Sequence, residues 1–109
     1  MTYDNALLQR IRTLVAGKPG YEEKKMFGGV CFLLHGNMAC GVLNEDLIVR
    51  VGPDSYEDSL KQPNTKPFDL TGKPMKGWVM VSAEGHKTSE ALTFWVNRGM
   101  AFALTLPAK

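Results

Sequence analysis

Four side chains that could bind a metal or carry out thiol chemistry occur within a short stretch of this 109-residue chain: Cys31, His35, Met38 and Cys40. If Gly36-Asn37 forms a two-residue hairpin loop, all four lie on one face of a sheet, as a soft ligand set that suits Cu(I) better than Zn(II). The two cysteines are then diagonal neighbours, roughly 7–8 Å apart, which is a poor geometry for a disulfide. A three-residue loop instead places the cysteines on opposite faces and removes the site.

Core packing is the favoured interpretation of these four residues, because unpaired Cys and Met commonly fill hydrophobic cores. Both cysteines lie in apolar segments, without the helix N-terminus or cationic neighbour that lowers a thiol pKa. His35 is expected in a solvated turn, and no third group that would orient it is identifiable. The sequence contains no phosphate-binding loop and no glycine motif for dinucleotide binding. It also has no pair of zinc-binding histidines on a helix and no Gly-x-Ser-x-Gly nucleophile elbow. We therefore expect a non-enzymatic protein without cofactor or metal, and keep a soft-metal or thiol-based enzyme as an alternative.

Lysines near a glycine pair form the second group of candidate residues. On a strand edge they discourage pairing with other sheets, whereas beside an aromatic ring they could meet phosphates. The net charge is only +2, so direct nucleic-acid binding is expected to be weak and remains an alternative. Binding of a protein partner is the interpretation that we favour for the following residues: Lys24, Lys25, Met26, Phe27, Gly28, Gly29, Lys73 and Lys76.

Hydrophobic periodicity predicts the elements that position these residues. Helices are expected over 3–16, from Pro53 to about Leu60, and from a Thr88 N-cap to Pro107. Strands are expected over 22–27, 30–34, 38–42, 47–51 and 77–81, with an extended loop over 61–76. Runs of antiparallel strands with helices at both ends predict an α+β, two-layer fold with an antiparallel sheet of about five strands.

Three residue types within these elements carry more specific expectations. The Gly28-Gly29 pair is expected to allow a bulge or a close backbone approach. Gly99 either ends the last helix or kinks it. Arg50 interrupts an apolar strand, and we expect it to pair with Asp46 or Glu45 or to face water. Trp78 and Trp95 are expected in the core.

The strand from Val30 to Leu34 consists of five consecutive apolar residues. An antiparallel strand with one solvent-exposed face alternates apolar and polar residues. This strand does not alternate, so it is expected to be covered on both faces. Helices can cover one face, and a second copy of the chain is the simplest cover for the other. We therefore expect a homodimer. The alternative is that the loop over 61–76 covers the strand.

Composition and processing signals define the class of protein. Apolar residues make up 44% and charged residues 22%, which is typical of a globular chain. No segment has the roughly 20 apolar residues that a membrane span needs. Neither a signal peptide nor a disulfide framework is apparent, so we expect a single cytoplasmic domain over residues 1–109 that does not contact membranes.

One succession of motifs resembles the TfoX N-terminal domain family, relatives of the Sxy/TfoX regulators of natural competence. The Lys-Met-Phe-Gly-Gly segment at 25–29 is the most specific, and it is followed by Gly36-Asn37-Met38, Leu47 to Val51, Pro67-Phe68 and Leu92…Trp95. The resemblance extends from about Leu7 to Leu106.

The resemblance implies an antiparallel sheet flanked by helices, similar to secretion-chaperone-like domains, and a non-enzymatic role with no catalytic residues to transfer. Full-length members act in transcriptional activation of competence genes together with the catabolite activator protein, which implies a partner in the transcription machinery. They carry a second, C-terminal domain, and this chain is expected to be a stand-alone member without it.

Overall fold

The computed structural model describes residues 5–26, 29–68 and 76–107. Its elements, in chain order, are α1 (Asn5–Val15), β1 (Tyr21–Met26), β2 (Gly29–Leu34), β3 (Asn37–Leu43), β4 (Asp46–Arg50), α2 (Pro53–Leu60), β5 (Thr65–Pro67), β6 (Trp78–Val81), the 3-10 helix η1 (Ala83–His86) and α3 (Ser89–Leu104). The predicted helices and strands are confirmed with small shifts at their ends. Strand β5 was not predicted, because its three residues lie in the segment expected to be a loop.

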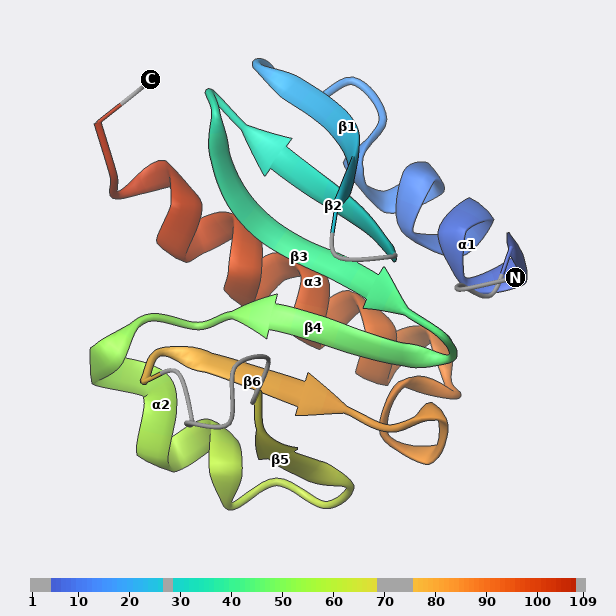
Figure 1. Ribbon diagram of the computed structural model, residues 1–109, viewed down its shortest axis with the longest axis vertical. Coiled ribbons are helices and arrows are strands. Elements are labelled where there is room, and N and C mark those ends of the chain that lie inside the picture. Colours follow the sequence, from blue (N-terminus) through green and yellow to red (C-terminus); the bar gives the residue numbers. More distant parts are fainter. Residues whose placement is uncertain (1–4, 27–28, 69–75, 108–109) are drawn as a thin grey trace.

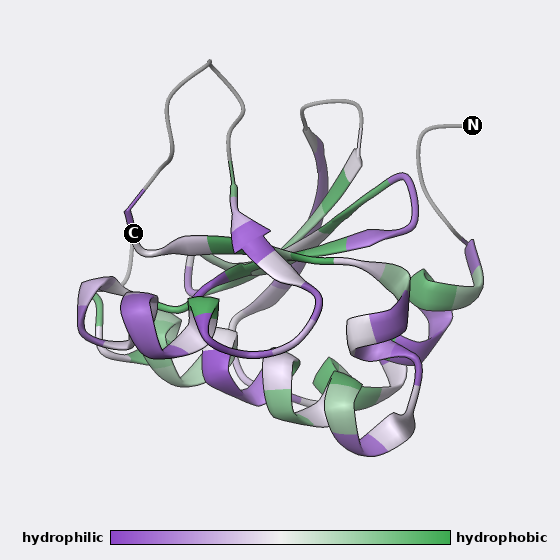
Figure 2. Ribbon diagram, turned by 90° about the horizontal axis from the view of Figure 1, so that it is seen from below, coloured by the Kyte–Doolittle hydropathy of each residue, from purple (hydrophilic) through white to green (hydrophobic). Residues whose placement is uncertain are grey.

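The strands form one six-stranded antiparallel sheet in the order β1-β2-β3-β4-β6-β5 (Figure 1). The α+β class is therefore confirmed, with six strands in place of about five. The helices lie together on one side of the sheet (Figure 2), and α3 packs across β3 and β4. Within the part of the chain that the structure describes, no helix has the length and apolar run needed to cross a membrane.

The larger hydrophobic core lies between the helices and the sheet. Helix α1 contributes Leu7 and Ile11, and α3 contributes Trp95 and Val96, all nearly inaccessible to water. Thr88 caps α3 as predicted, because its hydroxyl oxygen accepts a hydrogen bond of 3.1 Å from the amide of Ala91.

A second apolar cluster covers the opposite face of the sheet. Its buried members are at most 8% exposed: Cys31, Leu33, Met38, Ile48 and Phe68. Phe68 follows β5 and lies in the segment that the sequence alternative proposed as a cover. The premise that this face needs a second copy of the chain is therefore wrong, because these side chains are already buried within one molecule. Homodimerisation itself stays a prediction, and it needs a different surface.

The hairpin between β2 and β3 differs from the predicted one. Its two loop residues are His35 and Gly36, with φ angles of 52° and 83°, in the left-handed region that a type I′ turn requires. The register shifts between Phe32 and Leu33, so that β3 holds one residue more than β2 between Cα partners. This bulge, and not the loop length, decides which face of the sheet each cysteine occupies.

The glycine pair was expected to allow a bulge or a close approach, and a close approach is found at Gly29. Gly28 lies outside the described residues. A Cβ at position 29 would overlap the carbonyl oxygen of Val42 in the neighbouring strand β3. Gly29 is therefore a packing requirement of the sheet.

Gly99 does not end α3, which continues to Leu104. A Cβ at position 99 would overlap the carbonyl oxygen of Ala39 and would lie 3.2 Å from Cγ1 of Val49. The glycine thus lets α3 lie close to the backbone of β3 at the bulge. This contact fixes which side of α3 faces the sheet.

We predict that Gly99→Ala destabilises the protein, although alanine favours a helix by about 1 kcal/mol over glycine. The added methyl group must displace the backbone of Ala39, and we expect a net loss of about 1–3 kcal/mol. Urea denaturation followed by circular dichroism measures this loss. The control is Thr13→Ala, at an exposed position of α1 away from this contact, which should change stability by less than about 0.5 kcal/mol. A Gly99→Ala variant as stable as the native protein would disprove the close contact.

Candidate interaction surface

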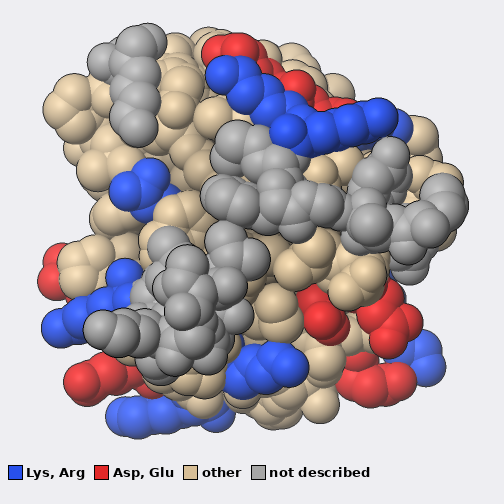
Figure 3. All heavy atoms as spheres, viewed as in Figure 1, with Lys and Arg blue, Asp and Glu red and all other residues tan. Residues whose placement is uncertain are grey.

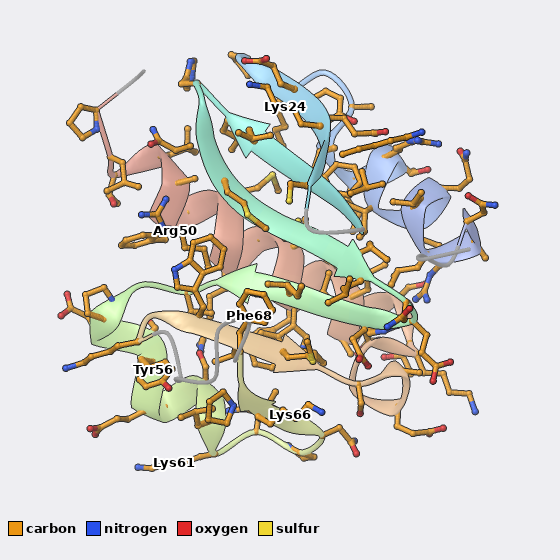
Figure 4. All side chains as sticks on the ribbon, in the orientation of Figure 1. Lys24, Arg50, Tyr56, Lys61, Lys66 and Phe68 are labelled. Atoms are coloured by element: carbon orange, nitrogen blue, oxygen red, sulfur yellow. The ribbon has the colours of Figure 1, made fainter. Side chains whose placement is uncertain are left out.

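The lysines that the sequence suggested as a partner-binding surface do not come together. Lys24 and Lys25 are exposed on the edge strand β1, and Lys76 is exposed just before β6. Three strands lie between β1 and β6. At ~4.8 Å from one strand to the next, β1 and β6 are about 19 Å apart across the sheet. Figure 4 likewise shows Lys24 at the opposite edge from Lys61 and Lys66. Outside the described residues lie Phe27, Gly28, Lys73 and the side chain of Met26.

Acidic residues accompany the basic ones on β1. Glu23 accepts two hydrogen bonds from Arg12, of 2.8 and 2.7 Å, and one of 3.0 Å from the hydroxyl of Tyr21. The hydrogen bonds from Arg12 lower the pKa of Glu23, and they keep the carboxylate ionised. On the face that Figure 3 shows, basic and acidic side chains are interspersed around the rim. This edge therefore presents mixed charge.

The cysteines are placed for packing. Cys31 belongs to the cluster with Phe68, whereas Cys40 belongs to the core beneath the helices, so they occupy opposite faces of the sheet. Burial raises the pKa of the Cys31 thiol, and burial together with the Cys31 charge raises that of Cys40 to about 12. A nucleophilic cysteine needs the opposite shift. In the described part of the chain, no group of three or more His, Cys, Asp or Glu residues is arranged to hold a metal ion.

Arg50 is stacked between two aromatic rings. Its guanidinium carbon lies 5.2 Å from the ring centre of Trp78 and 5.4 Å from that of Phe102. Neither Asp46 nor Glu45, the acids expected to pair with it, forms an ion pair with it. Such stacking stabilises a cation by about 0.5–2 kcal/mol. Arg50 thus links β4 and β6 to the end of α3, so its role is structural.

The outer face of α3 carries the two large hydrophobic side chains that are most exposed in the described residues. Phe94 is 42% exposed and Leu104 is 59% exposed. Asn97 and Ala101 lie between them on the same side of the helix and are also exposed. We define these four residues as the α3 stripe. Phe94 is held in place by the ring of Trp95, 5.0 Å away between centres, and by Arg98, whose guanidinium carbon lies 4.6 Å from its ring.

Two grooves run along the α3 stripe. The first has a volume of about 740 Å³ and lies between α3 and the start of α2, with Phe94, Arg98 and Phe102 in its wall. The second, of about 440 Å³, lies between the end of α3 and the turns that precede β1 and β3. Its wall includes Lys18 and His35 beside Met100 and Leu104. Asn97 and Ala101 line both grooves, so the stripe is the ridge between them.

Sequence reasoning missed the α3 stripe because it considered only the side of the helix that faces the core. The signal was available: Phe94 and Leu104 are apolar residues of α3 that do not belong to the buried stripe of Leu92, Trp95 and Val96. A helix with apolar residues on both sides is buried on both or has a partner. The stripe and its grooves are therefore the candidate interaction surface.

The buried thiol of Cys40 predicts a loss of stability at high pH. Above pH 9 the thiol ionises in the unfolded chain but stays protonated in the native one, where its pKa is raised to about 12. Stability should then fall by about 1.4 kcal/mol per pH unit from this group as pH rises from 9 towards 12. Urea midpoints measured between pH 8 and pH 10.5 test this. The Cys40→Ala variant should show a shallower slope, and equal slopes would contradict the burial.

Comparison with known proteins agrees with the resemblance noted in the sequence. The sequence model of the TfoX N-terminal domain matches residues 13–103, which span α1 to α3. A search of curated proteins and a search of solved structures each found no match. Since the match extends over most of the chain and includes the whole sheet and all of the α3 stripe except Leu104, this protein belongs to the TfoX N-terminal domain family, which is associated with regulators of competence.

Proposed function

We propose that this protein is a non-enzymatic interaction module that acts in transcriptional regulation, through a protein partner bound at the outer face of α3. The observation that carries the proposal is the α3 stripe, where Phe94 and Leu104 are exposed beside two open grooves. Exposed aromatic and aliphatic side chains next to grooves are typical of protein interfaces. Membership of the family supports the regulatory part of the proposal.

The chemistry of the described residues supports a binding role over a catalytic one. Both thiols are buried with raised pKa values, and the walls of the grooves are mostly apolar. Two unpaired cysteines also fit a reduced, cytoplasmic setting. Direct binding of nucleic acid is a less favoured role, because Lys24 and Lys76 lie far apart on the sheet and acidic residues accompany the lysines of β1.

Measurement of transcripts in the source organism tests the proposed function. Deletion of the gene should lower the abundance of competence transcripts, and Phe94→Glu expressed at the native level should reproduce the deletion. The matched control is Thr13→Glu on α1, an exposed position whose hydroxyl donates only to the carbonyl of Gln9 in its own helix. This control should keep the native transcript levels.

Two results would reject the proposal. Unchanged transcripts in the deletion strain would remove the regulatory role. Native transcript levels in the Phe94→Glu strain, with the variant folded and as abundant as the native protein, would remove the α3 stripe as the interaction surface.

A further inference from the structure

We infer that the outer face of α3 binds a second copy of this chain, with the two α3 helices antiparallel across a two-fold axis. This inference rests on the proposed function, because it names the partner of the same surface. The second face of the sheet is already buried within one molecule. The dimer interface is therefore placed on the helical side of the molecule and not on the sheet (Figure 2).

The spacing of the α3 stripe is the first observation. Phe94, Asn97, Ala101 and Leu104 follow one another at intervals of three, four and three residues, and this order reads the same from either end. A second α3 that is turned end over end therefore places its Leu104 opposite Phe94 and its Ala101 opposite Asn97. Such self-complementarity is what an interface between identical copies requires, and intervals of three and four residues form the seam between packed helices.

The charges at the two ends of the stripe are the second observation. Glu90 lies one turn before Phe94 and is exposed, and Glu84 lines a third groove, beside Phe94. Arg98 stacks on Phe94, but its charge is paired with Asp58 of the same chain at 3.4 Å, which leaves the two glutamates as the unmatched charges at this end. At the other end, Lys18 lines the groove beside Leu104. In an antiparallel pair the acidic end of each copy meets the basic end of the other. The two helix dipoles also point in opposite directions, so the positive end of each lies beside the negative end of the other. A parallel pair would bring like charges together.

The shape of the surface is the third observation. Ala101 is small and lies near the middle of the stripe, so two helices can approach to about 8 Å between axes. Phe94 of the second copy then lies at the level of Leu104, beside the groove of about 440 Å³. Leu104 of the second copy lies at the level of Phe94, beside the larger groove. Each copy thus offers an apolar recess for the large side chain of the other.

Sedimentation equilibrium tests whether the pair forms. The chain weighs 12.1 kDa, so the dimer has twice this mass, about 24 kDa, and it should dissociate on dilution. A mass of one chain at every concentration would overturn the inference. The transcript experiment would still stand in that case, so the failure of the dimer can be told apart from the failure of the proposed function.

A matched pair of variants tests whether α3 is the interface. Ala101→Arg places a long charged side chain at the centre of the stripe, and it should raise the dimer dissociation constant by about thirtyfold or more. Thr13→Arg puts the same side chain at an exposed position of α1 and should leave the dissociation constant unchanged. If Ala101→Arg dimerises like the native protein, the interface lies elsewhere and the inference is wrong.

Cross-linking tests the antiparallel register. Antiparallel packing places position 97 of one copy opposite position 101 of the other, within the reach of a disulfide. A mixture of Asn97→Cys and Ala101→Cys proteins should therefore form a mixed disulfide dimer faster than either variant alone, while the native cysteines stay buried. No preference for the mixed species would reject this register.

Discussion

The central strands of this sheet are buried on both faces, and this double burial determines where the molecule can present apolar surface. On one face the side chains of Phe32 and Val49 pack beneath α1 and α3. On the other, Cys31 and Ile48 pack against Phe68. Most of the large apolar side chains of the described strand residues are used in this way, and the exposed large hydrophobic side chains of the described residues belong to an element outside the sheet.

Helix α3 is that element, and its contact with β3 explains why. The absence of a side chain at Gly99 lets the helix lie against the carbonyl of Ala39, which orients Trp95 and Val96 into the core. The helix cannot rotate without losing this contact, so residues on its opposite side stay exposed. Phe94 and Leu104 are therefore presented to solvent by the same packing that stabilises the fold.

Local patterns in the sequence predicted most of the fold. The Thr88 cap, the helical periodicity and the apolar runs of the strands act over a few residues, and those elements are where they were expected. Features that depend on distant contacts were not predictable: the bulge at β3 is a shift in the pairing of β3 with β2, and the three residues of β5 are a strand through their pairing with β6. The α3 stripe was visible in the sequence only once the side of α3 facing the core was known. The lysine surface was predicted from neighbours in sequence, and the strand order places Lys24 and Lys76 far apart.

Amide chemical shifts recorded by NMR over a series of dilutions test most directly whether α3 carries the free apolar surface of the molecule. If α3 carries this surface, shifts should change with concentration along residues 90–104 and at the adjoining Lys18 and His35, while the amides of Cys31, Leu33 and Ile48 in the sheet keep constant shifts. Changes confined to the sheet, with α3 unaffected, would contradict it.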